Sequence, residues 1–79
     1  MPTNAAELIF ILTGSSLQYT AARRKLGLSP SHATWLTRPS NLVGQQQPKV
    51  VRYGDWKSLV RLAEIEAKMT EVAAQIRDL

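Results

Sequence analysis

The chain has 79 residues, no cysteine and a formal net charge of +4. A chain this short forms one small domain, and the lack of cysteine excludes disulfides and thiolate metal sites. No apolar run approaches the roughly 20 residues that a membrane span needs. The run at residues 8–12 follows Glu7 without a basic start, which argues against a signal peptide. We therefore expect a soluble, cytoplasmic protein.

The first predicted element is a helix that begins at Asn4 and ends at Gly14. Asn4 and Glu7 have the spacing of a capping box, and apolar residues recur at helical intervals up to Leu12. The β-propensity of residues 8–12 allows a strand instead. In either form the segment belongs to the core.

Residues 15–38 have the pattern of a helix-turn-helix. A helix over residues 16–26 is capped by Ser15 and closed by Gly27, and Ser29-Pro30 then begins a second, short helix. Ala33 and Leu36 share the inner face of that second helix. In a helix-turn-helix the second helix enters the DNA major groove.

A β-hairpin is predicted after Pro39. Leu42-Val43 and residues 49–53 read as two brief strands around a polar loop that contains Gly44. A hairpin in this place is called a wing. A flexible loop without a partner is the alternative.

The last predicted element is a long helix that begins after Gly54-Asp55 and continues to the end of the chain. Its apolar residues are spaced alternately by three and four, as in a coiled-coil seam. The seam residues are Leu62, Ile65, Met69, Val72, Ile76 and Leu79. We expect residues 1–61 to form the DNA-binding domain and residues 62–79 to form a homodimer helix, although docking onto a different protein fits the same stripe.

Positive charge is concentrated in the middle of the chain. Residues 23–61 carry eight basic side chains and one acid, Asp55, which favours a polyanionic partner. The residues predicted to contact DNA are Arg23, Arg24, Lys25, Ser29, Ser31, His32, Thr34, Arg38, Gln46, Lys49 and Arg52.

Residues for chemistry are scarce. His32 is the single histidine, and no cysteine or acidic cluster accompanies it, so we expect no metal site. Ser31-His32 lacks an orienting acid for nucleophilic catalysis. We therefore predict no enzymatic activity, no cofactor and no small-molecule ligand.

Two stretches resemble known DNA-binding families. Residues 14–36, GSSLQYTAARRKLGLSPSHATWL, are similar to the N-terminal segment of LysR-type regulators, with an extra Lys25 within the AARR-LG motif. Residues 50–65, VVRYGDWKSLVRLAEI, are similar to the wing-to-helix passage of MerR-type and excisionase-like domains. The resemblance implies a winged helix-turn-helix that binds double-stranded DNA as a dimer, of the kind that phages and other mobile elements encode.

The sequence thus predicts a mainly α fold: a three-helix helix-turn-helix core with a two-stranded β wing and a long C-terminal dimerisation helix. The predicted function is that of a small dimeric transcriptional regulator. The alternative is a small helical protein–protein interaction module, such as an inhibitor of a host machine.

Overall fold

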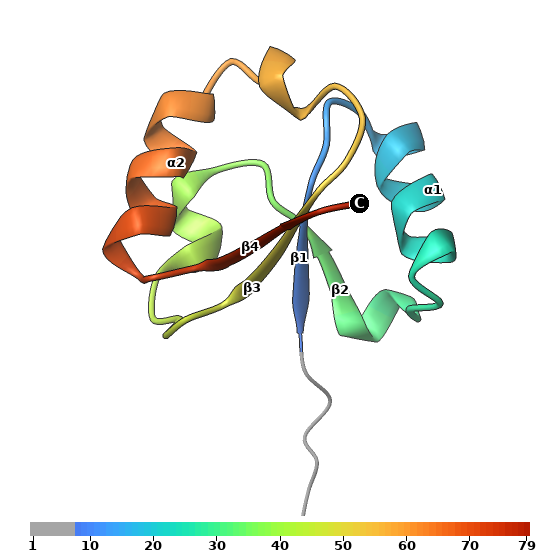
Figure 1. The fold of residues 1–79 in the computed structure, drawn as a ribbon, viewed down its shortest axis with the longest axis horizontal. Coiled ribbons are helices and arrows are strands. Elements are labelled where there is room, and N and C mark those ends of the chain that lie inside the picture. The colour runs from blue at the N-terminus through green and yellow to red at the C-terminus, as the bar shows by residue number, and fades with distance from the viewer. Residues whose placement is uncertain (1–7) are drawn as a thin grey trace, which may run out of the picture.

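A computed structural model of the chain describes residues 8–79, and the predicted start of a helix at Asn4 lies outside them. The fold is an α/β sandwich built on a four-stranded sheet (Figure 1). Its elements are β1 (Ile9–Leu12), α1 (Ser16–Lys25), β2 (Ala33–Trp35), β3 (Lys49–Arg52), α2 (Leu62–Glu71) and β4 (Gln75–Asp78). Short 3-10 turns at Pro30–His32, Pro39–Leu42 and Trp56–Ser58 connect them. The prediction of a mainly α helix-turn-helix fold is therefore wrong.

The strands follow the order β2-β1-β3-β4, and every neighbouring pair is parallel. Parallel strands need a crossover between them, and α1 and α2 supply two of these. Crossovers in such sheets are right-handed, so two that run in opposite directions place their helices on opposite faces. In Figure 1, α2 and α1 lie on the two sides of the sheet accordingly.

The residues of β1 are apolar on both sides, which explains why this run forms a strand. Phe10 and Leu12 join the core under α2, whereas Ile11 joins the core under α1. A strand that is covered on both faces reads as a continuous apolar run without alternation. Helical periodicity in so short a run was a coincidence, and the strand alternative is the one that the structure adopts.

The first helix of the predicted pair is confirmed as α1, but the second does not exist. Pro30–His32 is a single 3-10 turn, and the chain then extends into β2, which pairs in parallel with β1. Ala33 packs against α1, and Leu36, just after β2, packs on the α2 side. Ala33 and Leu36 therefore lie on opposite faces of the sheet, and their spacing of three residues does not reflect a helix.

The predicted wing is absent because its two halves do not pair. Leu42 lies fully buried at the end of a 3-10 turn, and β3 pairs with β1 and β4 instead. Val50 and Val51 are both buried, on opposite faces, so β3 is an internal strand of the sheet. The strand at residues 49–52 was predicted correctly, but its partner was not.

The long C-terminal helix is also contradicted. The helix α2 ends at Glu71, Ala73 takes a left-handed φ of 55°, and the chain continues as β4. Ile65 and Met69 are buried, and Leu62 and Val72 pack beside them, so these seam residues cover the chain's own sheet. The spacing of a short coiled-coil seam also fits an amphipathic helix on a sheet, which is the packing found here.

Candidate functional site

Doubly wound sheets hold their ligands at the switch point, beyond the carboxyl ends of the two strands whose connections diverge. Here these strands are β1 and β3, and the loops that follow them meet at Gln18 of α1. The Gln18 side-chain oxygen accepts hydrogen bonds from the backbone N–H groups of Gly14 and Asp55, both at 3.0 Å. Its Nε2 donates to the Asp55 carboxylate, also at 3.0 Å.

The loops at this switch point approach each other closely, and the Gln18 side chain lies between them. A Cβ on Gly14 would lie 2.7 Å from the Asp55 carbonyl oxygen, and one on Gly54 would lie 2.6 Å from Gln18 Oε1. The hydrogen bond to the Gly14 N–H is partly buried, whereas the two bonds between Gln18 and Asp55 are exposed. The Gln18 amide therefore bridges the two loops at the position where larger sheets of this type bind their ligands.

An open groove lies instead on the α1 side of β3 and β4. Because α1 covers β1 and β2, and α2 covers the opposite face, neither of these helices covers this part of the sheet. The groove has a volume of about 350 Å³. We call it the β3–β4 groove; its lining residues are Ile9, Lys49, Val50, Val51, Gln75, Ile76 and Arg77.

The side chains that face this groove follow from the strand register. Lys49 pairs with Gln75, and Val51 pairs with Arg77, and paired residues of parallel strands point to the same face. Ile9 pairs with Lys49 on the same side. The groove thus has an apolar floor, two basic side chains and one amide.

The helix α1 carries a further basic residue on the side that faces β3. Gln18 faces β3, because it bonds the loop that follows that strand. Ala21 and Lys25 lie three and seven positions later, on the same helical face, and both are exposed. Lys49 and Arg77 thus line the β3–β4 groove, and Lys25 lies on the face of α1 that Gln18 turns toward β3.

The nearest acid on β4 points the other way. Asp78 forms an ion pair with Arg52, Oδ1 to Nε at 2.6 Å, on the α2 side of the sheet. The hydrogen bond from Arg52 lowers the pKa of Asp78, and the same bond raises the pKa of Arg52. Arg52 also stacks over Trp56, 4.4 Å from the ring centre. This pair lies on the face of the sheet opposite the β3–β4 groove.

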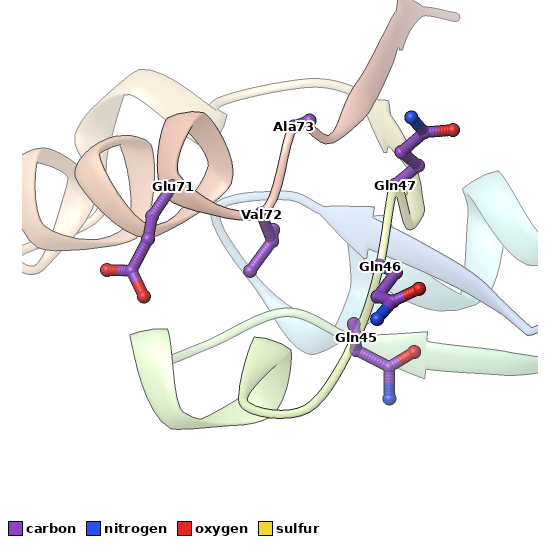
Figure 2. Close-up of a pocket in the computed structure, with 6 residues that line it drawn as sticks. All are labelled: Gln45, Gln46, Gln47, Glu71, Val72 and Ala73. Carbon is purple, nitrogen blue, oxygen red and sulfur yellow. The ribbon is translucent and has the colours of Figure 1, made fainter.

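A second hollow, of about 510 Å³, opens between the loop that precedes β3 and the end of α2 (Figure 2). It is lined by Gln45, Gln46, Gln47, Glu71, Val72 and Ala73. The backbone N–H of Gln47 donates to the Val72 carbonyl at 2.9 Å, which ties the loop before β3 to the end of α2. Glu71 is paired with Lys68 at 2.7 Å. The predicted DNA contact Gln46 lies here, away from the β3–β4 groove.

The other predicted contacts are spread over several elements. Arg23 donates to the Leu28 carbonyl at 3.0 Å and so holds the turn after α1, while Arg24 and Lys25 are exposed on its last turn. Thr34 is half-buried in β2, and Arg38 is exposed at the start of the following 3-10 turn. Lys49 lies in the groove, and Arg52 is bound to Asp78.

Three of the predicted DNA contacts, Ser29, Ser31 and His32, lie close together in the structure. Ser29 Oγ lies 3.0 Å from Ser31 Oγ and 3.2 Å from His32 Nδ1, at the turn before β2. These bonds join residues two and three positions apart and stabilise the turn locally. Within residues 8–79, no group of three or more histidine, cysteine or acidic side chains is placed to hold a metal ion. No helix in this part of the chain is long and apolar enough to cross a membrane.

Sequence reasoning missed two residues that shape the surface. Arg77 was read as part of a coiled coil, although Gln75 and Arg77 have the period-two spacing of one strand face. Gln18 carried no recognisable motif, because its partner Asp55 lies 37 residues away.

Comparisons of this chain with protein-family models, with curated proteins and with solved structures returned no match.

Proposed function

We propose that the protein binds nucleic acid through the phosphate backbone, in the β3–β4 groove. The observation that carries the proposal is the placement of Lys49 and Arg77 on one uncovered sheet face, with Lys25 on the adjoining flank of α1. Lysine and arginine contacts to phosphates release counterions, and this release supplies most sequence-independent affinity for nucleic acid.

The apolar part of the groove supports the same partner. Ile9 is half-buried in the groove beside the basic side chains, so a sugar or base could rest on it while phosphates meet the cations. The proposal involves no recognition helix, because Ser31 lies in a turn and Thr34 lies in a strand. We accordingly expect salt-dependent binding with little preference for sequence, and double-stranded DNA is the first polymer to test.

The test compares the substitutions Arg77→Gln and Lys25→Gln with a charge-matched control, Arg61→Gln. Arg61 is exposed at the start of α2, which covers the opposite face of the sheet. Binding to labelled duplex and single-stranded DNA is measured by fluorescence anisotropy over a range of salt concentrations. On duplex DNA, removing one lysine or arginine from a phosphate should make the slope of log K against log salt shallower by about 0.9.

We expect this change for Arg77→Gln and Lys25→Gln but not for Arg61→Gln. Equal losses of affinity in all three variants would mean that only net charge matters, and the groove assignment would then be wrong. No retention of either DNA at low salt would end the proposal altogether.

A further inference from the structure

Within residues 8–79, the backbone groups on the outer edge of β4 have no backbone partner. The N–H of Gln75 donates to the Pro48 carbonyl at 2.8 Å, and the N–H of Leu79 donates to the Arg52 carbonyl at 2.9 Å. In a parallel ladder, alternate residues bond the same neighbour, so residues 75, 77 and 79 face β3. The N–H and C=O groups of Ile76 and Asp78 therefore point outward, away from the sheet.

At the opposite edge of the sheet, formed by β2, a side chain bonds one of the outward backbone groups. Leu36 N–H bonds the Ile11 carbonyl at 2.8 Å, so the alternation directs the backbone groups of Ala33 outward. The Tyr19 hydroxyl donates to the Ala33 carbonyl at 3.2 Å and so occupies part of that edge. No comparable side-chain bond to a β4 carbonyl is found within residues 8–79. The strand β4 has no proline or bulge, and its protection is limited to its short length and the charges of Arg77 and Asp78.

An apolar side chain is exposed on the same strand. Ile76 is 45 % exposed, and Leu79, directly after β4, is 42 % exposed. Ile76 pairs with the buried Val50, so it lies at the margin of the core under α2. A strand added at this edge would cover Ile76 and satisfy the outward backbone groups together.

We infer that two copies of this chain pair edge to edge through β4, antiparallel, with Ile76 opposite the second copy's Ile76. Ile76 has both backbone groups directed outward, so in this register the two residues exchange two hydrogen bonds across the two-fold axis. A register centred on Arg77 would place two arginines opposite each other, and one centred on Asp78 would place two carboxylates opposite each other. Like charges in these positions destabilise a strand pair, so the Ile76 register is favoured over both of these.

The pairing does not depend on the proposed function. It joins the two sheets into one of eight strands, and side chains keep their face across an antiparallel pair. The β3–β4 grooves of the two copies would then lie side by side on one surface.

The register is tested with single cysteines, which is practical because the chain has none of its own. Opposed Ile76→Cys residues would have Cα atoms about 5.5 Å apart, within the range that a disulfide spans. Arg77→Cys residues would be offset along the strands by about 7 Å, which is too far for a disulfide. Val60→Cys, at a fully exposed position, controls for random collision.

Mild oxidation should give a covalent dimer of Ile76→Cys and little of the two other variants. In parallel, Ile76→Pro and Ile76→Lys are compared with the native chain by sedimentation equilibrium. Proline at this position removes an outward N–H and leaves every bond to β3 intact, and lysine places like charges opposite each other.

We expect a native dimer and a monomeric mass for both variants, with unchanged circular dichroism. Three results would overturn the inference: a native chain that stays monomeric at high concentration, a dimer that survives in folded Ile76→Lys, or equal cross-linking of Ile76→Cys and Val60→Cys. If Ile76→Pro unfolds, Ile76→Lys and the cysteine series still decide the question.

Discussion

Both helices end in a Schellman motif, but with different residues at the left-handed position. After α1, Gly27 has φ 69°, and the N–H of Leu28 bonds the Arg23 carbonyl at 3.0 Å. After α2, the equivalent position is Ala73, with φ 55°, and the N–H of Ala74 bonds the Met69 carbonyl at 2.8 Å. A left-handed conformation costs an alanine roughly 1–2 kcal/mol that a glycine does not incur.

Exchanging these residues should therefore change stability in opposite directions. Ala73→Gly relieves the backbone strain but adds flexibility to the unfolded chain, so the free energy of unfolding should rise by about 0.5–1 kcal/mol. Gly27→Ala should lower it by about 1 kcal/mol, because a Cβ there meets no atom within 4 Å and only the backbone is strained. Urea unfolding measures both; a loss of stability in Ala73→Gly would contradict the motif.

The ion pair between Arg52 and Asp78 makes the stability of the folded protein depend on pH, and the direction of this dependence follows from the pKa of Asp78. Its hydrogen bond lowers the pKa of Asp78 in the folded protein, so the stabilisation is fully present above the ordinary aspartate pKa. It is lost as the pH falls below that value and through the lowered pKa. The effect is small, because the Asp78 side chain is 66 % exposed and exposed pairs contribute little.

An NMR titration of the Asp78 carboxyl group should show this shift directly. In the variant Arg52→Gln, which removes the positive partner, we expect the pKa of Asp78 to rise toward its ordinary value. An unchanged Asp78 titration in Arg52→Gln would show that the pair is not formed in solution.

At the scale of elements, α2 supplies much of the core on its face of the sheet. Met69 is 2 % exposed and Ile65 is fully buried, among Phe10, Leu12 and Val50 of the strands. Met69→Ala should lower the free energy of unfolding by about 2–5 kcal/mol, as large-to-small changes in cores do. Because Met69 packs within its own chain, we expect no direct effect on assembly.

The effect of Met69→Ala distinguishes a core position from a coiled-coil seam, and an exposed change on the same helix serves as its control. Glu66→Gln, an exposed change on the same helix, should alter stability by less than about 0.5 kcal/mol. The measurements are denaturant unfolding and solution mass for both variants. A Met69→Ala protein that keeps native stability but falls from dimer to monomer would support the seam and contradict the core position.

Elements with local signals could be predicted from the sequence, and those without could not. The Ser15 cap and the Gly27 stop define α1, and valines with an aromatic define β3. In contrast, β2 and β4 have only three and four residues, and neither follows a hairpin turn that would indicate its partner strand. They form strands because they pair with residues more than 20 positions away, and local propensity carries no information about such pairing.

At the scale of the whole molecule, the same limit applies to the candidate surface. The cluster of basic residues in the middle of the chain was visible in the sequence, and Lys25 and Lys49 were among those predicted. Arg77 joins them only because β4 lies beside β3. Arg23 and Arg52 looked equally suitable in the sequence, but neither lines the groove: Arg23 bonds the Leu28 carbonyl, and Arg52 pairs with Asp78 on the α2 side.

The position of β1 has a consequence for synthesis. It is the first strand in the described part of the chain but a central one in the sheet, with β2 on one side and β3 on the other. On the ribosome, one of its edges stays without a neighbour until Lys49–Arg52 has emerged, and contacts that join distant residues form slowly. The nascent chain therefore holds its most apolar segment exposed over that interval, and this is the stage at which a chaperone would engage it.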